Sequence, residues 1–215
     1  TNIELPVEKT YPKTSAGKIN NFGIKELLGT GTSSFIDSIP NRVYNIGLSA
    51  SKTNGILVPP GEVYSFNQYL GEVTAATGFK QAYVIKEGKT VLDDGGGVCQ
   101  VSTTLFRAVL NSGLPIIERT AHAYRVGFYE QGGSPPGFDA TVFPPSVDFK
   151  FKNDTSSYIL VQNQMVGTTL TFRIYGTSDD RVSTIGKPVI LSQTPPPPDL
   201  RTDDPTLPKG VEKEI

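Results

Sequence analysis

The stretch GGGVCQVSTTLF, residues 95–106, constrains the fold more than any other, because three glycines lead directly into a helical apolar pattern. Residues 95–97 can take backbone angles closed to other residues and let another segment approach closely. Apolar residues then recur at helical spacing up to Val109, and Gly113 is typical of a helix end. The sequence therefore predicts a central helix that begins at Cys99.

Cys99 is the only cysteine of the chain, and we expect it in the first turn of that helix. Free backbone N–H groups and the helix dipole there favour a thiolate and lower a thiol pKa from about 8.5. The N–H groups of Cys99 and Gln100 are the predicted oxyanion donors. Gly97, Ser102 and Thr103 are predicted to contact substrate, although the two hydroxyls could instead cap the helix. The alternative is that Cys99 is a small packed residue.

The only histidine, His122, follows in the segment IIERTAHAYRVGFY, whose β-branched and aromatic residues predict a strand. Asp139 comes next, in PPGFDATVF. Cysteine, histidine and acid in this order match a nucleophile, a base and a group that orients the base. We therefore predict that Cys99, His122 and Asp139 are catalytic. Asp148 or Glu118 could orient the imidazole instead, as could a backbone carbonyl.

Three further expectations concern these residues and their surroundings. Tyr124 and Arg125 share the segment of His122 and are predicted to line a substrate groove. Arg125 could pair there with a carboxylate of the substrate, or it could be an ordinary solvated arginine. Asp139, in a Gly-Phe-Asp turn, could also make only a local bond to the backbone. Residues 129–138 carry two glycines side by side and two prolines, which predicts a loop over the site.

Composition narrows the class of protein. Twenty basic residues balance 21 acidic ones, which argues against a nucleic-acid partner. No apolar run approaches the length of a membrane span, so we expect no membrane insertion by this segment. One cysteine excludes an internal disulfide, and one cysteine with one histidine argues against a zinc site. We expect neither a metal nor a cofactor.

The remaining patterns predict an α+β fold, with a mostly antiparallel sheet packed on the central helix and a second helix N-terminal to it. That second helix is expected over residues 40–52, and a hairpin around Gly88. Further strands are predicted around Tyr64 and Phe66, from Ile116 to His122, and at 141–143, 147–152, 157–163, 168–176 and 187–192.

We divide the chain into three parts. Residues 1–16 are predicted to be the tail of a preceding domain or an added edge strand, and residues 17–192 the main domain, with a core over 40–176. Four consecutive prolines within 193–215 predict a proline-rich linker that leads into the start of a further module.

Several longer strings resemble one known family. They are PPGEVYSFNQYLG, GFKQAYVI, DDGGGVCQVSTTLFRAVLNSGLPIIER, His122 itself, GFDATV and DFKFKN. Together they resemble the VanW family of bacterial cell-envelope proteins over roughly residues 40–176. The chain lacks the His-then-Ser-Gly-Cys arrangement of YkuD-type transpeptidases, and its order of Cys, His and Asp is similar to that of transglutaminase-like enzymes.

The resemblance implies an extracellular, wall-facing protein from a vancomycin-resistance-associated family, anchored through parts outside this sequence. Some members resemble L,D-transpeptidases, which implies peptidoglycan stem peptides as partners, Cys99 as the nucleophile of 3-3 cross-linking and His122 as its base. Two alternatives remain. One is a non-catalytic wall-binding or scaffolding module, and the other is a thiol peptidase or amidase that uses the same residues.

Overall fold

The computed structural model describes residues 22–192 apart from residue 87, together with the short pieces 194–195, 198, 201 and 207–212. The strand predicted within residues 1–16 lies outside the described residues, as does most of 193–215.

The main sheet is antiparallel and has four strands, in the order β1-β9-β8-β2. These strands are β1 (Glu26–Ser34), β2 (Ile56–Val58), β8 (Ile159–Val166) and β9 (Thr169–Gly176). β9 shows why the sheet forms, because Leu170, Phe172 and Ile174 alternate with polar residues and are completely buried on one face. A half-buried strand of this kind needs a partner layer over its apolar face.

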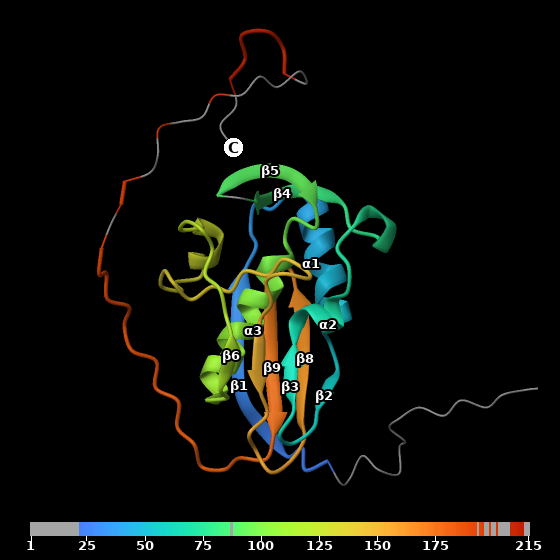
Figure 1. Cartoon of the computed structure of the whole chain (residues 1–215), viewed down its shortest axis with the longest axis vertical. Coiled ribbons are helices and arrows are strands. Elements are labelled where there is room, and N and C mark those ends of the chain that lie inside the picture. Colours follow the sequence, from blue (N-terminus) through green and yellow to red (C-terminus); the bar gives the residue numbers. More distant parts are fainter. Residues whose placement is uncertain are drawn as a thin grey trace, which may run out of the picture.

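The partner layer is α3 (Val98–Ser112), which lies across β1 and β9 in Figure 1. Val101, Leu105 and Val109 form its buried stripe. The helix can lie directly on β1 because that strand presents glycines: a Cβ at Gly29 would stand 2.6 Å from the Ala108 carbonyl oxygen. The predicted α+β fold with one central helix is therefore confirmed, and the helix begins one residue before Cys99.

The other elements surround the amino end of α3. α1 (Pro40–Lys52) has the predicted bounds and packs against α3. The predicted hairpin forms from β4 (Gln81–Lys86) and β5 (Lys89–Asp94) and lies beyond the end of the main sheet in Figure 1. A third sheet has the order β3-β7-β6, built from β3 (Val63–Ser65), β6 (Ile116–Glu118) and β7 (Lys150–Lys152). The short helical segments are α2 (Phe66–Leu70), η2 (Ala75–Thr77) and η3 (Gly127–Glu130).

Several predicted strands were wrong. His122 does not lie on a strand, because β6 ends at Glu118 and only an isolated bridge between Thr120 and Thr141 follows. Residues 141–143 likewise form only isolated bridges, and no strand occurs at 187–192. Phe66 begins α2, since Ser65 caps that helix by accepting from the Gln68 N–H at 3.2 Å. Hydrogen bonds between loops, which sequence periodicity does not report, take the place of a sheet ladder around His122 and at 141–143.

The close approach of α3 to β1 predicts the effect of adding one methyl group. In Gly31→Ala the new Cβ would collide with the backbone of Thr104 and Ala108, so we expect a loss of about 2–3 kcal/mol in the free energy of unfolding. Gly47→Ala, on α1, is the matched control because its Cβ would meet only Met165 Cε, at 3.6 Å. That variant should be neutral or stabilising by up to about 1 kcal/mol. Urea unfolding of both variants decides the matter, and equal stabilities would contradict the packing described.

Candidate active site

The glycine loop before α3 fixes the position of Cys99. A Cβ at Gly96 would stand 2.5 Å from the Tyr83 carbonyl oxygen on β4, and one at Gly97 would stand 2.9 Å from the Arg42 carbonyl oxygen on α1. Gly97 also has a φ of 112°, which other residues rarely adopt. The loop is therefore held between α1 and the hairpin, and Cys99 follows as the second residue of α3.

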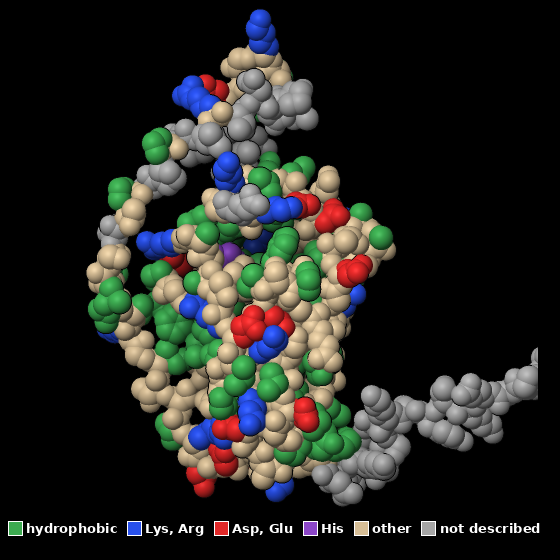
Figure 2. Space-filling model, in the orientation of Figure 1, with side chains coloured by type: hydrophobic (Ala, Val, Ile, Leu, Met, Phe, Trp, Pro, Cys, Tyr) green, Lys and Arg blue, Asp and Glu red, His purple; other side chains and the backbone are tan. Residues whose placement is uncertain are grey.

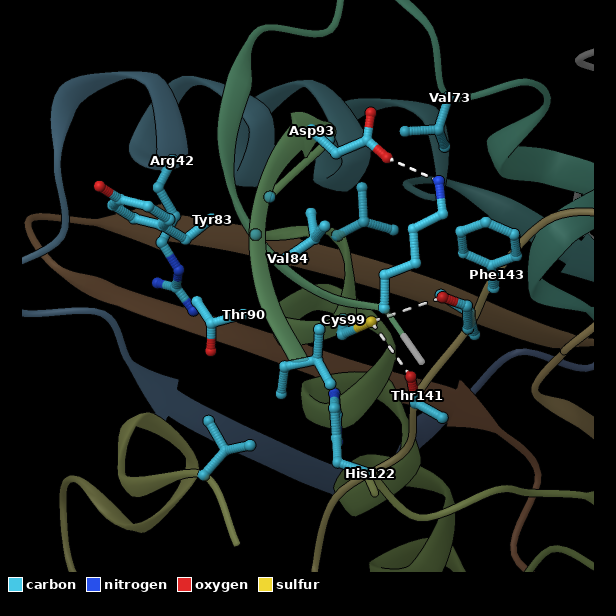
Figure 3. A pocket seen from close by; sticks show the side chains of 18 of the residues that line it. Arg42, Val73, Tyr83, Val84, Thr90, Asp93, Cys99, His122, Thr141 and Phe143 are labelled. Carbon is cyan, nitrogen blue, oxygen red and sulfur yellow. Dashed lines mark hydrogen bonds and ion pairs between the residues drawn. The ribbon is translucent and has the colours of Figure 1, made fainter. Parts of the chain in front are cut away.

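Cys99 opens onto a cleft of about 1270 Å³. Its side chain is partly exposed, and its sulfur lies 3.5 Å from Thr141 Oγ1 and 3.5 Å from the Val142 carbonyl oxygen. Figure 3 shows Cys99 and His122 on the lining, with the hairpin residues Tyr83 and Thr90 across from them. In Figure 2 the histidine is visible from outside, at the bottom of a hollow.

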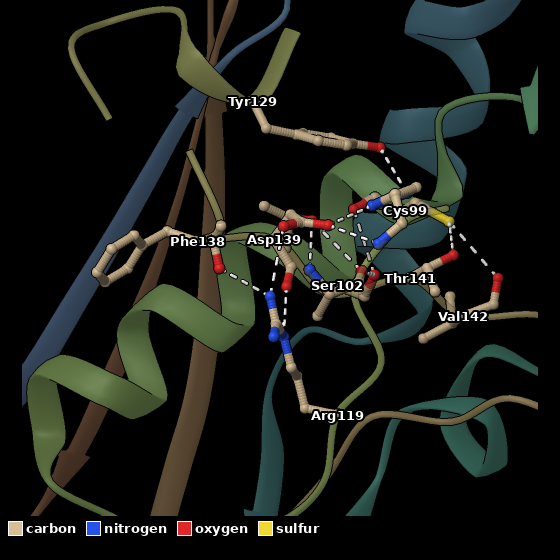
Figure 4. Close-up of polar contacts among 12 residues, drawn as sticks. Cys99, Ser102, Arg119, Tyr129, Phe138, Asp139, Thr141 and Val142 are labelled. Carbon is tan, nitrogen blue, oxygen red and sulfur yellow. Dashed lines mark hydrogen bonds and ion pairs between the residues drawn. The ribbon is translucent and has the colours of Figure 1, made fainter. Parts of the chain in front are cut away.

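Asp139 and His122 form a tight pair. His122 Nδ1 lies 2.6 Å from Asp139 Oδ2, and the same oxygen accepts from the His122 backbone N–H at 2.9 Å. Arg119 binds the other side of Asp139 (Figure 4), with Nε donating to the Asp139 carbonyl at 2.7 Å and a guanidinium nitrogen 3.3 Å from Oδ1. The carboxylate therefore holds Nδ1, which leaves Nε2 as the nitrogen available to the cleft.

The electrostatics favour an ion pair between the thiol and the imidazole. Burial alone would raise the pKa of the Cys99 thiol. The hydrogen bond and charge of His122, together with the hydrogen bonds of Val142 and Thr141, outweigh burial, so this pKa lies below its usual value. Burial would lower the pKa of His122, but hydrogen bonds with Asp139 and Cys99 raise it to about 9. Both shifts act in the same direction and favour a thiolate–imidazolium pair over the neutral pair.

The other acids considered for the orienting role are engaged elsewhere. Asp148 accepts from Ser65 Oγ at 2.5 Å and from the Asn67 N–H at 2.9 Å, at the start of α2. Glu118 pairs with Lys150 Nζ at 2.8 Å. The structure therefore brings Cys99, His122 and Asp139 together, as predicted, and leaves Asp148 and Glu118 outside the group.

Three neighbours of Cys99 do not have the predicted surroundings. Ser102 and Thr103 are completely buried, and both bind the Ala140 carbonyl oxygen, at 2.7 and 3.3 Å. They neither cap α3 nor reach the cleft. The Gln100 N–H donates to the Gly97 carbonyl at 3.0 Å, so it is not free as an oxyanion donor. The Cys99 N–H, by contrast, donates to no carbonyl within the described part of the chain.

Tyr124 and Arg125 both line the cleft, and both have protein partners. Tyr124 Oη lies 2.7 Å from Thr90 Oγ1 and so ties the loop of His122 to the hairpin. Arg125 is exposed and its guanidinium binds both oxygens of Glu130, at 2.5 and 2.6 Å. Its charge is therefore already neutralised by a protein carboxylate.

Tyr129 is a site residue that the sequence reasoning missed. Its ring lies 4.8 Å from the His122 ring, and its hydroxyl lies 3.3 Å from Nε2. Burial, reinforced by the charge of Cys99, raises the pKa of Tyr129 well above its usual value, so the phenol stays protonated. Nothing in the sequence around Tyr129 distinguishes it from a tyrosine of an ordinary loop.

The comparisons with known proteins bear on this arrangement. The model of the VanW family, described as VanW like protein, matches residues 41–175. The chain belongs to the VanW family. That family is associated with vancomycin resistance, as the name of one relative below records.

Two curated relatives show the extent of the match. The chain is 36% identical over 175 residues to the uncharacterized protein YoaR of Bacillus subtilis, covering 81% of this chain and 56% of that protein. It is 35% identical over 115 residues to the vancomycin B-type resistance protein VanW of Enterococcus faecalis, covering 54% of this chain and 42% of that protein. This VanW-family chain thus spans about half the length of these relatives. No solved structure matches it significantly.

Two other observations concern the described residues alone. Their helices include none with both the length and the apolarity that crossing a membrane requires. Within the same residues, no three His, Cys, Asp or Glu side chains gather where they could hold a metal ion.

The thiolate–imidazolium pair predicts how alkylation of Cys99 depends on pH. In the wild-type chain the reaction with iodoacetamide should already be fast at neutral pH, because the pKa of Cys99 is lowered. In His122→Asn the rate should rise only at a pH at least about one unit higher. Intact-mass measurement of the adduct over pH 5–10 gives both profiles. Superimposable profiles would contradict the pair.

The Asp139 contact predicts the protonation of His122. In Asp139→Asn the pKa of His122 should fall from about 9 toward its ordinary value of 6.5, because the carboxylate that stabilises the imidazolium is gone. Glu118→Gln is the matched control and should leave the pKa unchanged. Because the folded-state pKa is raised, the stabilisation lost in Asp139→Asn should be largest below pH 6.5 and vanish as pH rises through about 9. Titration of the single imidazole by NMR follows the change, and an unaltered pKa in Asp139→Asn would contradict the assignment.

Proposed function

We propose that this chain transfers acyl groups on peptidoglycan stem peptides, as an L,D-transpeptidase-like enzyme that forms a thioester on Cys99. The observation that carries the proposal is the arrangement of a thiol, an imidazole hydrogen-bonded to a carboxylate, and an open cleft beside them. The association of the VanW family with vancomycin resistance supports a substrate from the cell wall. In this proposal the cleft faces the wall, outside the membrane.

The first half of the reaction forms the acyl-enzyme. The Cys99 thiolate attacks the carbonyl carbon of an L-centre residue that is linked to a terminal D-amino acid, and a tetrahedral oxyanion results. As the C–N bond breaks, the His122 imidazolium gives its Nε2 proton to the leaving amine. The D-amino acid departs, and His122 is left neutral with Nδ1–H still bound by Asp139.

The second half regenerates the enzyme. An amine of a neighbouring stem peptide attacks the thioester carbonyl, and the neutral His122 takes a proton from that amine. The C–S bond then breaks, the cross-link is released, and the thiolate–imidazolium pair is restored. Water in place of the amine would give a peptidase or amidase reaction on the same residues.

Two donors are placed to stabilise the oxyanion. The Cys99 N–H at the start of α3 has no carbonyl partner within the described residues, and it adjoins the sulfur. The Tyr129 phenol is protonated, and when it accepts from the imidazolium its own proton is free to donate. Tyr129 thus takes the place that Gln100 was predicted to fill.

Turnover of a disaccharide-tetrapeptide tests the proposal. The wild-type chain should release the terminal D-amino acid, form a cross-linked dimer, and carry an acyl adduct on Cys99 that intact-mass measurement detects. Cys99→Ala should lose both products and the adduct, and Glu118→Gln should retain turnover within about threefold.

The products distinguish a transferase from a hydrolase and from a wall-binding module. Release of the D-amino acid without a dimer would mean that water, not an amine, resolves the thioester. Binding of the peptide with no adduct and no product in the wild-type chain would contradict the proposal and leave a wall-binding module.

A further inference from the structure

Arg42 is a cation in the cleft that the mechanism above does not use. It lies in the first turns of α1, and its side chain reaches the start of α3, where a Cβ on Gly97 would stand 3.2 Å from Arg42 Cγ. Its guanidinium is part of the cleft lining (Figure 3). Arg42 and Cys99 therefore line the same cleft, and Arg42 lies against the glycine loop that leads into α3.

The groups that contact Arg42 are all neutral. Its two terminal nitrogens donate to Ser38 Oγ at 2.7 Å and to Gln100 Oε1 at 2.8 Å, and its Cζ lies 4.3 Å from the centre of the Phe128 ring. Among the described residues no carboxylate lies within 4.0 Å of it. Arg42 is only 9% exposed, so its charge is buried without a contacting carboxylate. Burial lowers the pKa of Arg42, although the nearby Tyr129 and Cys99 oppose this shift.

Burying the Arg42 guanidinium in this way costs free energy unless an anion binds to it. A guanidinium carries five N–H donors in a planar fork, and two of the five are used here. The fork matches a carboxylate, and burial strengthens the attraction. Four acids among the described residues line the cleft. Asp93 pairs with Lys86 at 3.1 Å and Asp94 accepts from the Ala75 N–H at 2.7 Å, while Asp37 and Glu72 make no ion pair with Arg42 within 4.0 Å.

We infer that Arg42 binds the free α-carboxylate at the C-terminal end of the donor peptide. The inference rests on the proposed function, since a donor bound there would present its last peptide bond to Cys99. The carboxylate belongs to the departing D-residue and lies one residue beyond the carbonyl under attack. The site therefore selects stems that end at that residue and rejects internal bonds, which have no charge at this position.

The test compares two donors that differ only at that end. One is a disaccharide-tetrapeptide with a free carboxylate, and the other is its C-terminal carboxamide. Binding is measured by calorimetry on the full chain with Cys99→Ala, so that no reaction occurs. The carboxamide should bind about 10- to 100-fold more weakly, because it loses a charge-assisted hydrogen bond and an ion pair.

Variants locate the effect. With Arg42→Gln added, the two donors should bind within about threefold of each other, and Arg42→Lys should restore part of the preference. Arg173→Gln on β9, away from the cleft, is the matched control and should keep the full preference. Equal binding of the two donors by the Cys99→Ala chain that keeps Arg42 would overturn the inference, and this result requires no substitution of Arg42. A full preference that persists in Arg42→Gln would overturn it as well.

Measurements of turnover and of binding distinguish failure of the proposed transferase from failure of the proposed carboxylate site. A preference for the free carboxylate that depends on Arg42, in a chain whose Cys99 forms no thioester, would retain the carboxylate site and remove the transferase. Turnover of both donors at equal kcat/KM would retain the transferase and remove the carboxylate site.

Discussion

The geometry of the site depends on hydrogen bonds that hold the segment of Asp139 against α3. Ser102 and Thr103 bind the Ala140 carbonyl oxygen, the Ala140 N–H donates back to Thr103 at 3.0 Å, and Arg107 Nε donates to the Phe138 carbonyl at 3.0 Å. Because these groups are buried, each bond left unmade would carry the full cost of desolvation. One face of α3 thus fixes the carboxylate that orients His122, and its first turn carries Cys99. The nucleophile and the orienting acid are positioned by the same helix.

Much of this could be predicted from the sequence. The glycines before Cys99 and the apolar stripe up to Val109 predicted α3, because the spacing of apolar residues along the sequence directly reflects which face of a helix is buried. The grouping of Cys99 with His122 and Asp139 followed from the order of residue types and from the family resemblance. The strand predicted at His122 and the substrate contacts of Ser102 and Thr103 were wrong, since both depend on hydrogen bonds between distant segments. The free N–H predicted at Gln100 was wrong because the first turn of α3 bonds it locally to the Gly97 carbonyl. Tyr129 and Arg42 were missed for the same reason, as nothing local to either residue places it near the thiol.

The charges of the cleft divide into two groups. The Cys99 thiolate, the His122 imidazolium and the Asp139 carboxylate alternate in sign, so each stabilises its neighbour, with Arg119 behind the carboxylate. Arg42 stands apart, with only neutral contacts. The first group is complete in the free protein, whereas the second needs an anion. This division separates residues that carry out chemistry from a residue that selects the substrate.

The reactivity of the site depends on the lowered pKa of Cys99, the only thiol of the chain, and on the part that His122 has in lowering it. The ultraviolet absorbance of a thiolate near 240 nm measures this directly, as the difference between the wild-type chain and Cys99→Ser. The structure predicts that the thiolate signal of the wild-type chain appears at a lower pH than that of His122→Asn. A wild-type signal that emerges only above pH 8.5, with the ordinary titration of a free cysteine, would contradict the account.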